Sequence, residues 1–224
     1  MRFMKFSRFE FLIALYIFCV MASNLMGAKT VPLITIGNYT LNGTVALLVL
    51  PLVFTINDVI TEVYGRRRAR SIVFMSLAII LLQTLFALIA TSLPPSARFA
   101  PTEVAYDTIF GISIRFAIAS LIAFAVSEFL DIKVFTAIRD KYGAKALWLR
   151  TNASNFVSEF VDTATFMIIA FWAVDLDAGA NLSFIASLAI PYWLLKCLLS
   201  VLETPLAYWG VRWLRRGKKE EAEA

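Results

Sequence analysis

The segment TNASNFVSEFVDTATF, residues 151–166, places polar side chains on one face of a predicted helix. Asn155, Ser158, Glu159 and Asp162 follow one another at steps of three, one and three residues. Because an α-helix turns once every ~3.6 residues, these spacings gather the four side chains on one stripe. Carboxylates accept hydrogen bonds from N–H groups, while amides and hydroxyls both donate and accept. Since the strongly apolar run MIIAFW follows, the stripe predicts a binding site for a polar ligand inside a membrane.

Ionisable side chains recur inside other apolar segments of the chain. Asp58 and Glu62 stand four residues apart and therefore share a helix face, and Lys196 lies within the last apolar segment. A charge at mid-depth in a bilayer costs about 2.5–3.5 kcal/mol on insertion scales, so such groups are candidates for function. The complete set of candidate substrate-binding residues is Asp58, Asp162, Lys196, Asn155, Ser158, Glu159, Glu62, Asn24, Glu203 and Trp193.

Several common catalytic sites are missing from the sequence. The chain has no histidine, which removes the commonest metal ligand and the commonest general base. No Walker motif is present, and no Gly-x-Gly-Asp sequence surrounds Asp58 or Asp162, which argues against nucleotide hydrolysis and against intramembrane aspartyl proteolysis. We therefore expect a protein that is not an enzyme and that binds no metal and no cofactor.

The composition indicates the elements that must position these side chains. Of the 224 residues 60% are hydrophobic, and the mean hydropathy is +0.76, whereas soluble domains contain roughly 45–50% apolar residues. About 20 apolar residues in a helix cross a bilayer. The pattern predicts an all-α integral membrane protein with six transmembrane helices near 9–27, 43–64, 70–93, 112–135, 152–174 and 184–208. These helices form one domain, residues 1–216, and residues 217–224 form a polar cytoplasmic tail.

Basic residues predict the orientation of the chain. Most of its 21 Lys and Arg residues precede the first span, follow the second and fourth spans, or follow the last. Because basic flanks stay in the cytoplasm during insertion, we expect both termini there and the protein in the cell (inner) membrane. The net charge of +5 is spread over these flanks instead of one face, so we expect lipid contacts and no nucleic-acid partner.

The predicted topology brings the carboxylates to one layer. Asp58 and Asp162 both fall in the cytoplasmic half of the membrane, and Lys196 lies nearer mid-depth as a counter-charge. A water-lined cavity that opens inward would hydrate these groups, whereas a channel would place polar groups along its full depth. Pro51 and Pro205 are each predicted to break a helix, which frees a backbone carbonyl beside such a cavity.

Three segments carry a resemblance to a known family. They are DVITEVYG at the end of the second span, VDTATF in the fifth and PYWLLKCLLSVLETP in the sixth. In this order, on six predicted spans, the chain resembles the queuosine precursor transporter family, also called the vitamin uptake transporter family, over nearly its whole length. The resemblance implies import of 7-cyano-7-deazaguanine or 7-aminomethyl-7-deazaguanine, precursors of the tRNA base queuosine, by a proton-coupled or facilitative secondary carrier.

The substrate that the resemblance implies has a guanine-like edge. Its N1–H and 2-amino groups are adjacent donors, which one carboxylate accepts in bidentate fashion. Asp58 and Asp162 match positions in the family motifs and are the expected partners of this edge. The ring acceptors and the ring face are expected to meet Asn155, Ser158, Lys196 and Trp193.

Alternative roles remain open. Glu62 could lie at the headgroups and pair with nearby arginines, and Asn24 could bond a neighbouring helix. An alternative function is the substrate-binding subunit of an ATP-driven energy-coupling-factor type vitamin transporter. Such subunits usually present an A-x-x-x-A face on helix one, which this chain lacks; only Ala119 and Ala123 have that spacing. Together with Ala117 they form a small-residue stripe that predicts contact with a second copy in a homodimer.

Overall fold

A computed structural model of the chain describes residues 7–37, 39–142, 147–202 and 204–222. The elements in chain order are α1 (Arg8–Met26), β1 (Thr30–Ile36), β2 (Tyr39–Thr44), η1 (Val45–Leu48), α2 (Leu50–Tyr64), α3 (Arg66–Ser92), η2 (Ala100–Thr102), α4 (Glu103–Tyr142), α5 (Leu147–Phe171), α6 (Ala178–Leu202) and α7 (Thr204–Ala222). Helices dominate the described chain, as expected for the predicted all-α class, but the structure adds one two-stranded sheet that this class does not include.

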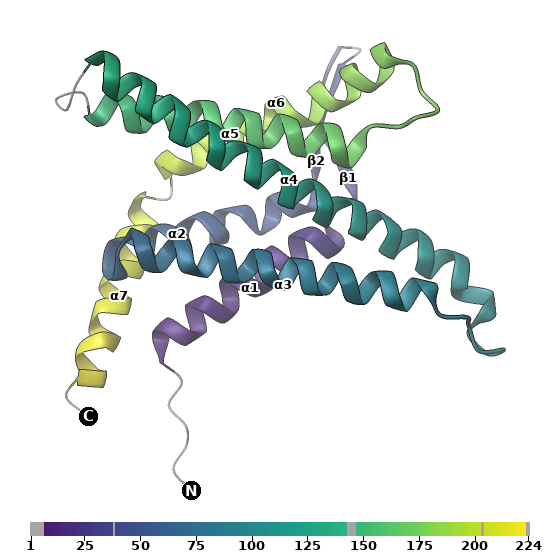
Figure 1. Cartoon of the computed structure of the whole chain (residues 1–224), viewed down its shortest axis with the longest axis horizontal. Coiled ribbons are helices and arrows are strands. Elements are labelled where there is room, and N and C mark those ends of the chain that lie inside the picture. The colour runs from purple at the N-terminus through teal and green to yellow at the C-terminus, as the bar shows by residue number, and fades with distance from the viewer. Residues whose placement is uncertain (1–6, 38, 143–146, 203, 223–224) are drawn as a thin grey trace, which may run out of the picture.

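The helices form two groups that α4 joins. In Figure 1, α1, α2 and α3 lie together in the lower half, and α5 and α6 lie in the upper half. The long helix α4 runs diagonally between the groups and contacts α5, α3 and α1. α7 leaves the upper group and crosses to the ends of α1 and α2, so that the start of α1 and the end of α7 lie on the same side of the view (Figure 1).

Four helices of the described chain are long and apolar enough to cross a membrane. They lie in Arg8–Met26, Arg66–Ser92, Ala100–Leu130 and Ala178–Lys196. α2 has only 15 residues, fewer than the ~20 that a bilayer requires, and α5 carries the polar stripe. A multi-pass membrane protein is therefore confirmed, while six spans and the orientation of the termini stay predictions.

The span predicted at 43–64 differs most from the structure. Its first part belongs to a β-hairpin and to η1, and Pro51 lies in the first turn of α2. Proline is tolerated there because the first N–H groups of a helix have no intrahelical partner. The prediction that Pro51 breaks a helix was therefore wrong.

The hairpin itself was not predicted. β1 and β2 pair antiparallel on either side of a turn at Gly37, where φ is 60°. Two short runs rich in β-branched residues, separated by a Gly-Asn pair, are a known hairpin pattern that the apolar composition concealed. The hairpin lies behind α6 in Figure 1, and the Asn42 side chain donates a hydrogen bond of 3.1 Å to Ser187 Oγ of α6.

The last predicted span, 184–208, is divided. α6 ends at Leu202, α7 begins at Thr204, and Pro205 lies in the first turn of α7. This agrees with the predicted break at Pro205. α7 then continues to Ala222, so most of the predicted polar tail is helical.

The small-residue stripe of α4 lies inside the chain. Ala117, Ala119 and Ala123 are almost completely buried, and Ala119 packs with Phe116 and with Ala170 of α5. Small side chains allow α4 and α5 to approach closely. The prediction that this stripe contacts a second copy was therefore wrong, because the chain's own helices cover it.

Candidate functional site

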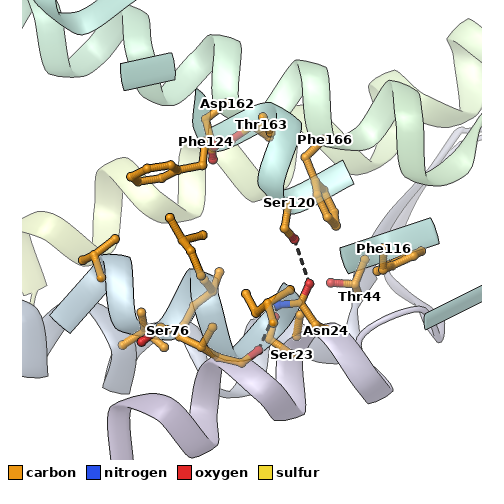
Figure 2. A pocket seen from close by; sticks show the side chains of 18 of the residues that line it. Ser23, Asn24, Thr44, Ser76, Phe116, Ser120, Phe124, Asp162, Thr163 and Phe166 are labelled. Carbon is orange, nitrogen blue, oxygen red and sulfur yellow. Dashed lines mark hydrogen bonds between the residues drawn. The ribbon is translucent and has the colours of Figure 1, made fainter. Parts of the chain in front are cut away.

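A cavity of about 240 Å³ lies where α1 to α6 approach one another (Figure 2). All six helices contribute to its wall, together with the end of the hairpin. Its polar lining residues are Tyr16, Ser23, Asn24, Thr44, Ser76, Ser120, Asp162, Thr163, Tyr192 and Lys196. Because a helix bundle gathers many side chains at such a point, the cavity is a candidate ligand site.

An ion pair forms one part of the wall. Lys196 Nζ of α6 lies 3.1 Å from Asp162 Oδ2 of α5, and the ammonium is 5.5 Å from the centre of the Tyr192 ring. Asp162 and Lys196 were predicted as neighbours, and the structure brings them together. They are also the only charged residues in the described lining of the cavity.

The turn between α5 and α6 fixes the register of this ion pair. The Asn181 side chain accepts a hydrogen bond from the backbone N–H of Ala173 and donates to the Ala173 and Leu176 carbonyls, at 2.8, 2.8 and 3.1 Å respectively. Asn181 is buried, so water competes little for these hydrogen bonds. They hold the two helices at one relative position, which sets Lys196 against Asp162.

Arg115 fixes the end of α5 from the side of α4. Its guanidinium donates to the carbonyls of Ile169 (2.7 Å) and Trp172. The last carbonyls of a helix lack intrahelical partners, so an arginine stabilises them. The role of Arg115 is thus to secure the end of α5, the helix that carries Asp162 about two turns earlier.

A neutral polar wall faces the ion pair. Ser120 Oγ of α4 donates to Asn24 Oδ1 of α1 at 2.8 Å, and Asn24 Nδ2 donates to the Val20 carbonyl at 3.0 Å. Figure 2 shows Asp162 and Thr163 on one side of the cavity, Ser23 and Asn24 on the other, and Ser120 between them. Asn24, which was predicted from sequence, therefore lines the same cavity as Asp162.

Thr163 contributes a buried hydroxyl that has no partner. Its side chain is 1% exposed, and Oγ1 makes no hydrogen bond. A buried polar atom normally finds a partner, because leaving one unpaired costs about 1–3 kcal/mol. Thr163 lines the cavity beside Asp162, so a ligand there can satisfy this hydroxyl.

Asp58 and Glu62 lie in a different place. They line a groove of about 610 Å³ between α2 and α7, together with Thr61, Tyr208, Arg212 and Arg215. Glu62 Oε1 pairs with Arg215 at 3.1 Å, while Asp58 is exposed. The structure thus separates these two carboxylates from the ion pair with which they were predicted to converge.

Three further predicted residues, Ser158, Glu159 and Trp193, do not line the cavity in the described structure. Ser158 and Glu159 are partly buried on α5, before Asp162. Trp193 packs edge-on against Phe156 and Phe160, with ring centres 4.9 and 5.6 Å away. The side chain of Asn155 and the whole of Glu203 lie outside the described residues.

Several lining residues were missed from sequence. Ser76 of α3 and Ser120 of α4 each sit in a stripe of cavity-lining residues at helical spacing, but each stripe is otherwise mostly apolar. The aromatic lining consists of Phe116, Phe124 and Phe166 with Tyr16 and Tyr192. A search for single small polar residues in apolar helices would have found the serines, whereas no local signal separates these aromatics from lipid-facing ones.

The described residues offer no metal site. No three His, Cys, Asp or Glu side chains among them gather closely enough to hold an ion. The chemistry of the cavity is therefore that of hydrogen bonds, one ion pair and aromatic faces.

Curated relatives of the chain are found in three bacteria. A probable queuosine precursor transporter of Bacillus subtilis (strain 168) is 32% identical over 193 residues, which are 85% of this chain and 79% of the relative. The queuosine precursor transporter of Escherichia coli (strain K12) is 29% identical over 123 residues, 54% of this chain and 52% of the relative. A probable queuosine precursor transporter of Haemophilus influenzae is 27% identical over 168 residues, 70% of this chain and 67% of the relative.

A family model described as "Putative vitamin uptake transporter" matches residues 44–210. This range contains Asp58 and Glu62 of the groove, Asp162, Lys196 and most of the cavity wall. It leaves out Arg212 and Arg215 of the groove, and α1 with Asn24. No solved structure matches the chain. Because the model covers well over half of the sequence, the resemblance seen in the sequence motifs is confirmed, and the chain belongs to the vitamin uptake transporter family.

Proposed function

We propose that the protein is a secondary carrier that imports 7-deazaguanine precursors of queuosine across the cell membrane. Family membership and the names of its three curated relatives support this function. The substrate is a flat bicyclic heterocycle that carries a nitrile or aminomethyl group at position 7. A cavity of about 240 Å³ is smaller than the ~300–1,000 Å³ typical of sites for drug-sized ligands, which suits a ring system of this size.

The observation that carries the proposal is the position of Asp162 beside Lys196 in the cavity wall. The guanine-like edge presents two donors, the 2-amino group and N1–H, followed by one acceptor, O6. The Asp162 carboxylate accepts from both donors, and the Lys196 ammonium, 3.1 Å from that carboxylate, donates to O6. The ion pair therefore offers acceptors and a donor in the order that this edge requires.

The other walls supply the remaining contacts. The unpartnered Thr163 hydroxyl and the Asn24–Ser120 pair can bond ring nitrogens or the group at position 7. Phe116 and Phe166, whose ring centres are 5.4 Å apart, offer apolar faces to the ring. Contacts from α1, α4 and α5 would thus close around one substrate.

The charge of the cavity favours an uncharged substrate. One carboxylate and one ammonium line the described wall, so its net charge is zero. The aminomethyl precursor is a cation, and the described wall has no second carboxylate to neutralise it. Its ammonium group would therefore lose water on entering the cavity without a compensating ion pair, which costs free energy. We infer that the 7-cyano precursor competes better than the 7-aminomethyl precursor.

Asp58 and Glu62 belong to a second polar region on the transport path. Their groove lies between α2 and α7, at the side of the molecule where α1 begins and α7 ends (Figure 1). With the predicted orientation this is the cytoplasmic side, so the groove would serve substrate release. Its contacts to substrate are transient and exposed to water, unlike those of the cavity.

Uptake of labelled 7-cyano-7-deazaguanine tests the function. The full chain would be expressed in a bacterial strain that neither makes nor imports this compound, and queuosine in tRNA would be measured. We expect queuosine to appear with the wild-type chain and to fall sharply with Asp162→Asn. Uptake equal to that of the empty strain would refute the function, and normal uptake by a chain carrying both Asp58→Asn and Asp162→Asn would refute the site.

Reconstitution separates this function from that of a subunit of an ATP-driven complex. The alanines that could have docked a partner are buried in the chain, which favours a carrier that acts alone. Purified protein in liposomes should therefore accumulate or equilibrate substrate without added protein or ATP. Binding without transport, restored only by an ATPase partner, would support the subunit instead.

A further inference from the structure

The β-hairpin lies at the end of the molecule that also carries the α3–α4 and α5–α6 connections (Figure 1). We call this the outer end, because the predicted orientation places it outside the cell. The connections there carry only two basic residues, Lys29 and Arg98, as expected for a face that is not cytoplasmic. A substrate that arrives from outside therefore meets the hairpin before it reaches the central cavity.

The end of β2 forms part of the cavity wall. Thr44 is 3% exposed and lines the cavity, and Figure 2 shows it on the side that also carries Phe116. The residue before it, Gly43, is buried as well, and a Cβ atom there would come within 2.6 Å of Leu47 and 2.8 Å of Leu33. The chain thus fills the space at this point, and β2 closes the cavity toward the outer end.

One side-chain hydrogen bond holds β2 against α6. The Asn42 amide donates to Ser187 Oγ at 3.1 Å, and no second hydrogen bond joins the described side chains of the hairpin to α6. Ser187 is buried and precedes the cavity-lining Tyr192 by five residues, which is roughly 8 Å along the helix axis. The Asn42–Ser187 bond, here called the latch, therefore lies just outside the cavity.

The helices at the outer end are joined to one another more firmly. Asn181 bonds three backbone groups in the turn between α5 and α6, and Arg115 of α4 bonds two carbonyls at the end of α5. Ser113 Oγ of α4 donates to the Leu25 carbonyl of α1 at 2.9 Å. These bonds connect α1, α4, α5 and α6 in series. The hairpin is thus the part of the outer end that can separate from α6 with the smallest loss of hydrogen bonds.

The hairpin also keeps its own hydrogen bonds when it moves. β1 and β2 bond to each other, and the Val45 N–H donates to the Lys29 carbonyl at 2.9 Å where the two strands meet α1 and η1. The hydroxyls of Thr35 and Thr40, one on each strand, are 3.2 Å apart. Separation from α6 therefore breaks the latch and apolar contacts but leaves the ladder intact.

We propose that the hairpin is the outer gate of the cavity: β2 must separate from α6, with loss of the latch, before substrate can enter from outside. Lids of this kind sequester a site and then open to exchange its ligand. The inference rests on the proposed carrier function, because a carrier exposes its site to one side of the membrane at a time. Closure buries Thr44 in the cavity wall, and opening exposes it to the outside.

A disulfide across the latch tests the gate. The two native cysteines would be replaced by alanine, and the full chain carrying Asn42→Cys/Ser187→Cys would be oxidised with copper phenanthroline in the uptake strain. We expect oxidation to abolish uptake of 7-cyano-7-deazaguanine and dithiothreitol to restore it. Thr35→Cys/Thr40→Cys is the matched control: its disulfide joins the two strands but not α6, so uptake should be unchanged.

Labelling of Thr44→Cys measures opening without any need for transport. Because residue 44 is buried in the closed hairpin, a membrane-impermeant maleimide added to intact cells should react with it slowly. Asn42→Ala and Ser187→Ala each remove the latch and should speed this reaction about fivefold, the factor that corresponds to about 1 kcal/mol for a neutral hydrogen bond. Two latch variants cover the case in which one of them disturbs folding. Thr35→Val, which removes a hydrogen bond inside the hairpin, should leave the rate unchanged.

The two experiments separate the gate from the carrier function. If neither the wild-type chain nor the reduced Asn42→Cys/Ser187→Cys chain imports substrate, the carrier function fails, while faster labelling of the latch variants would still support an opening hairpin. Four outcomes would overturn the gate: no disulfide across the latch under conditions that join residues 35 and 40, full uptake by the chain with the latch disulfide, equal loss of uptake with both disulfides, or labelling that neither latch variant speeds.

Discussion

Two ion pairs of equal length occupy very different regions of this molecule. Lys196 and Asp162 in the central cavity, like Arg215 and Glu62 in the α2–α7 groove, are 3.1 Å apart. The cavity pair is 9% and 33% exposed, respectively, and the groove pair 58% and 65%. Because solvent screens exposed charges, the groove pair should contribute only about 0–1 kcal/mol to the stability of the fold. Removal of one partner from the cavity pair instead leaves the other charge poorly hydrated. Distance alone does not distinguish a binding site from a surface contact.

The first and largest expected effect is that of Lys196→Met. It leaves the Asp162 carboxylate in the cavity without its counter-charge. We expect the free energy of unfolding of the purified protein to fall by about 3 kcal/mol, the lower end of the range for a broken buried pair, since Asp162 keeps some contact with solvent. Chemical denaturation in detergent, followed by Trp fluorescence, measures this change, and uptake should be lost as well.

The double variant Asp162→Asn/Lys196→Met is the matched control. Without either charge, the cavity should recover most of the lost stability, because neutral side chains carry little desolvation penalty. Uptake should remain absent, since the edge of the substrate has lost its partners. If the Lys196→Met variant were as stable as the wild type, the Asp162–Lys196 pair would be as accessible to solvent as the Glu62–Arg215 pair, and the comparison would fail.

The second prediction compares one carboxylate from each region. Asp162→Asn keeps the size of the side chain but replaces a charged acceptor with a neutral amide. A hydrogen bond to a charged group contributes about 1.5–3 kcal/mol, so we expect the apparent KM for 7-cyano-7-deazaguanine to rise roughly 10- to 100-fold. Asp58→Asn, in the exposed groove, should raise it less than about threefold. Initial uptake rates over a range of substrate concentrations provide both values. Equal effects would mean that recognition extends into the groove.

The difference between the regions also explains what could be predicted from sequence. A charge in the middle of an apolar segment is visible in any sequence, so Asp162 and Lys196 could be selected as candidates. Their contact required only that α5 and α6 be antiparallel neighbours, which a short connection between two helices makes the usual outcome. The buried Asn181 that fixes their register gave no signal, because asparagine is also common in exposed turns.

Asp58 could not be placed in the same way. α2 begins only at Leu50, because the hairpin and η1 take up the residues before it, and it reaches the cavity with Leu50 and Val53. Asp58 lies five residues beyond Val53, which is roughly 8 Å further along the helix axis. The depth of a side chain in the membrane thus depends on the residue at which its helix begins. Because the hairpin residues are as apolar as a helix, hydropathy alone does not show that α2 begins after a hairpin.

The third prediction concerns the hydroxyl of Thr163. Thr163→Val removes a buried polar atom that has no partner in the free protein, so stability should be equal or slightly higher. The apparent KM should nevertheless rise, by about threefold to tenfold, if a substrate atom bonds this hydroxyl. Thr84→Val is the matched control, because that buried hydroxyl already bonds the Ile80 carbonyl of its own helix and does not line the cavity. A rise in KM shared by both variants would assign the effect to packing.

The smallest expected effect comes from the groove pair. A double-mutant cycle with Glu62→Gln and Arg215→Gln should give a coupling energy below about 1 kcal/mol that disappears in about 0.5 M salt, because both side chains are largely exposed. Uptake should retain its KM, although the maximal rate can change if the pair opens and closes during release. A coupling energy above about 2 kcal/mol that persists in salt would contradict the comparison: it would show that the bilayer shields the groove from water, and that both regions bury their charges in the membrane-embedded protein.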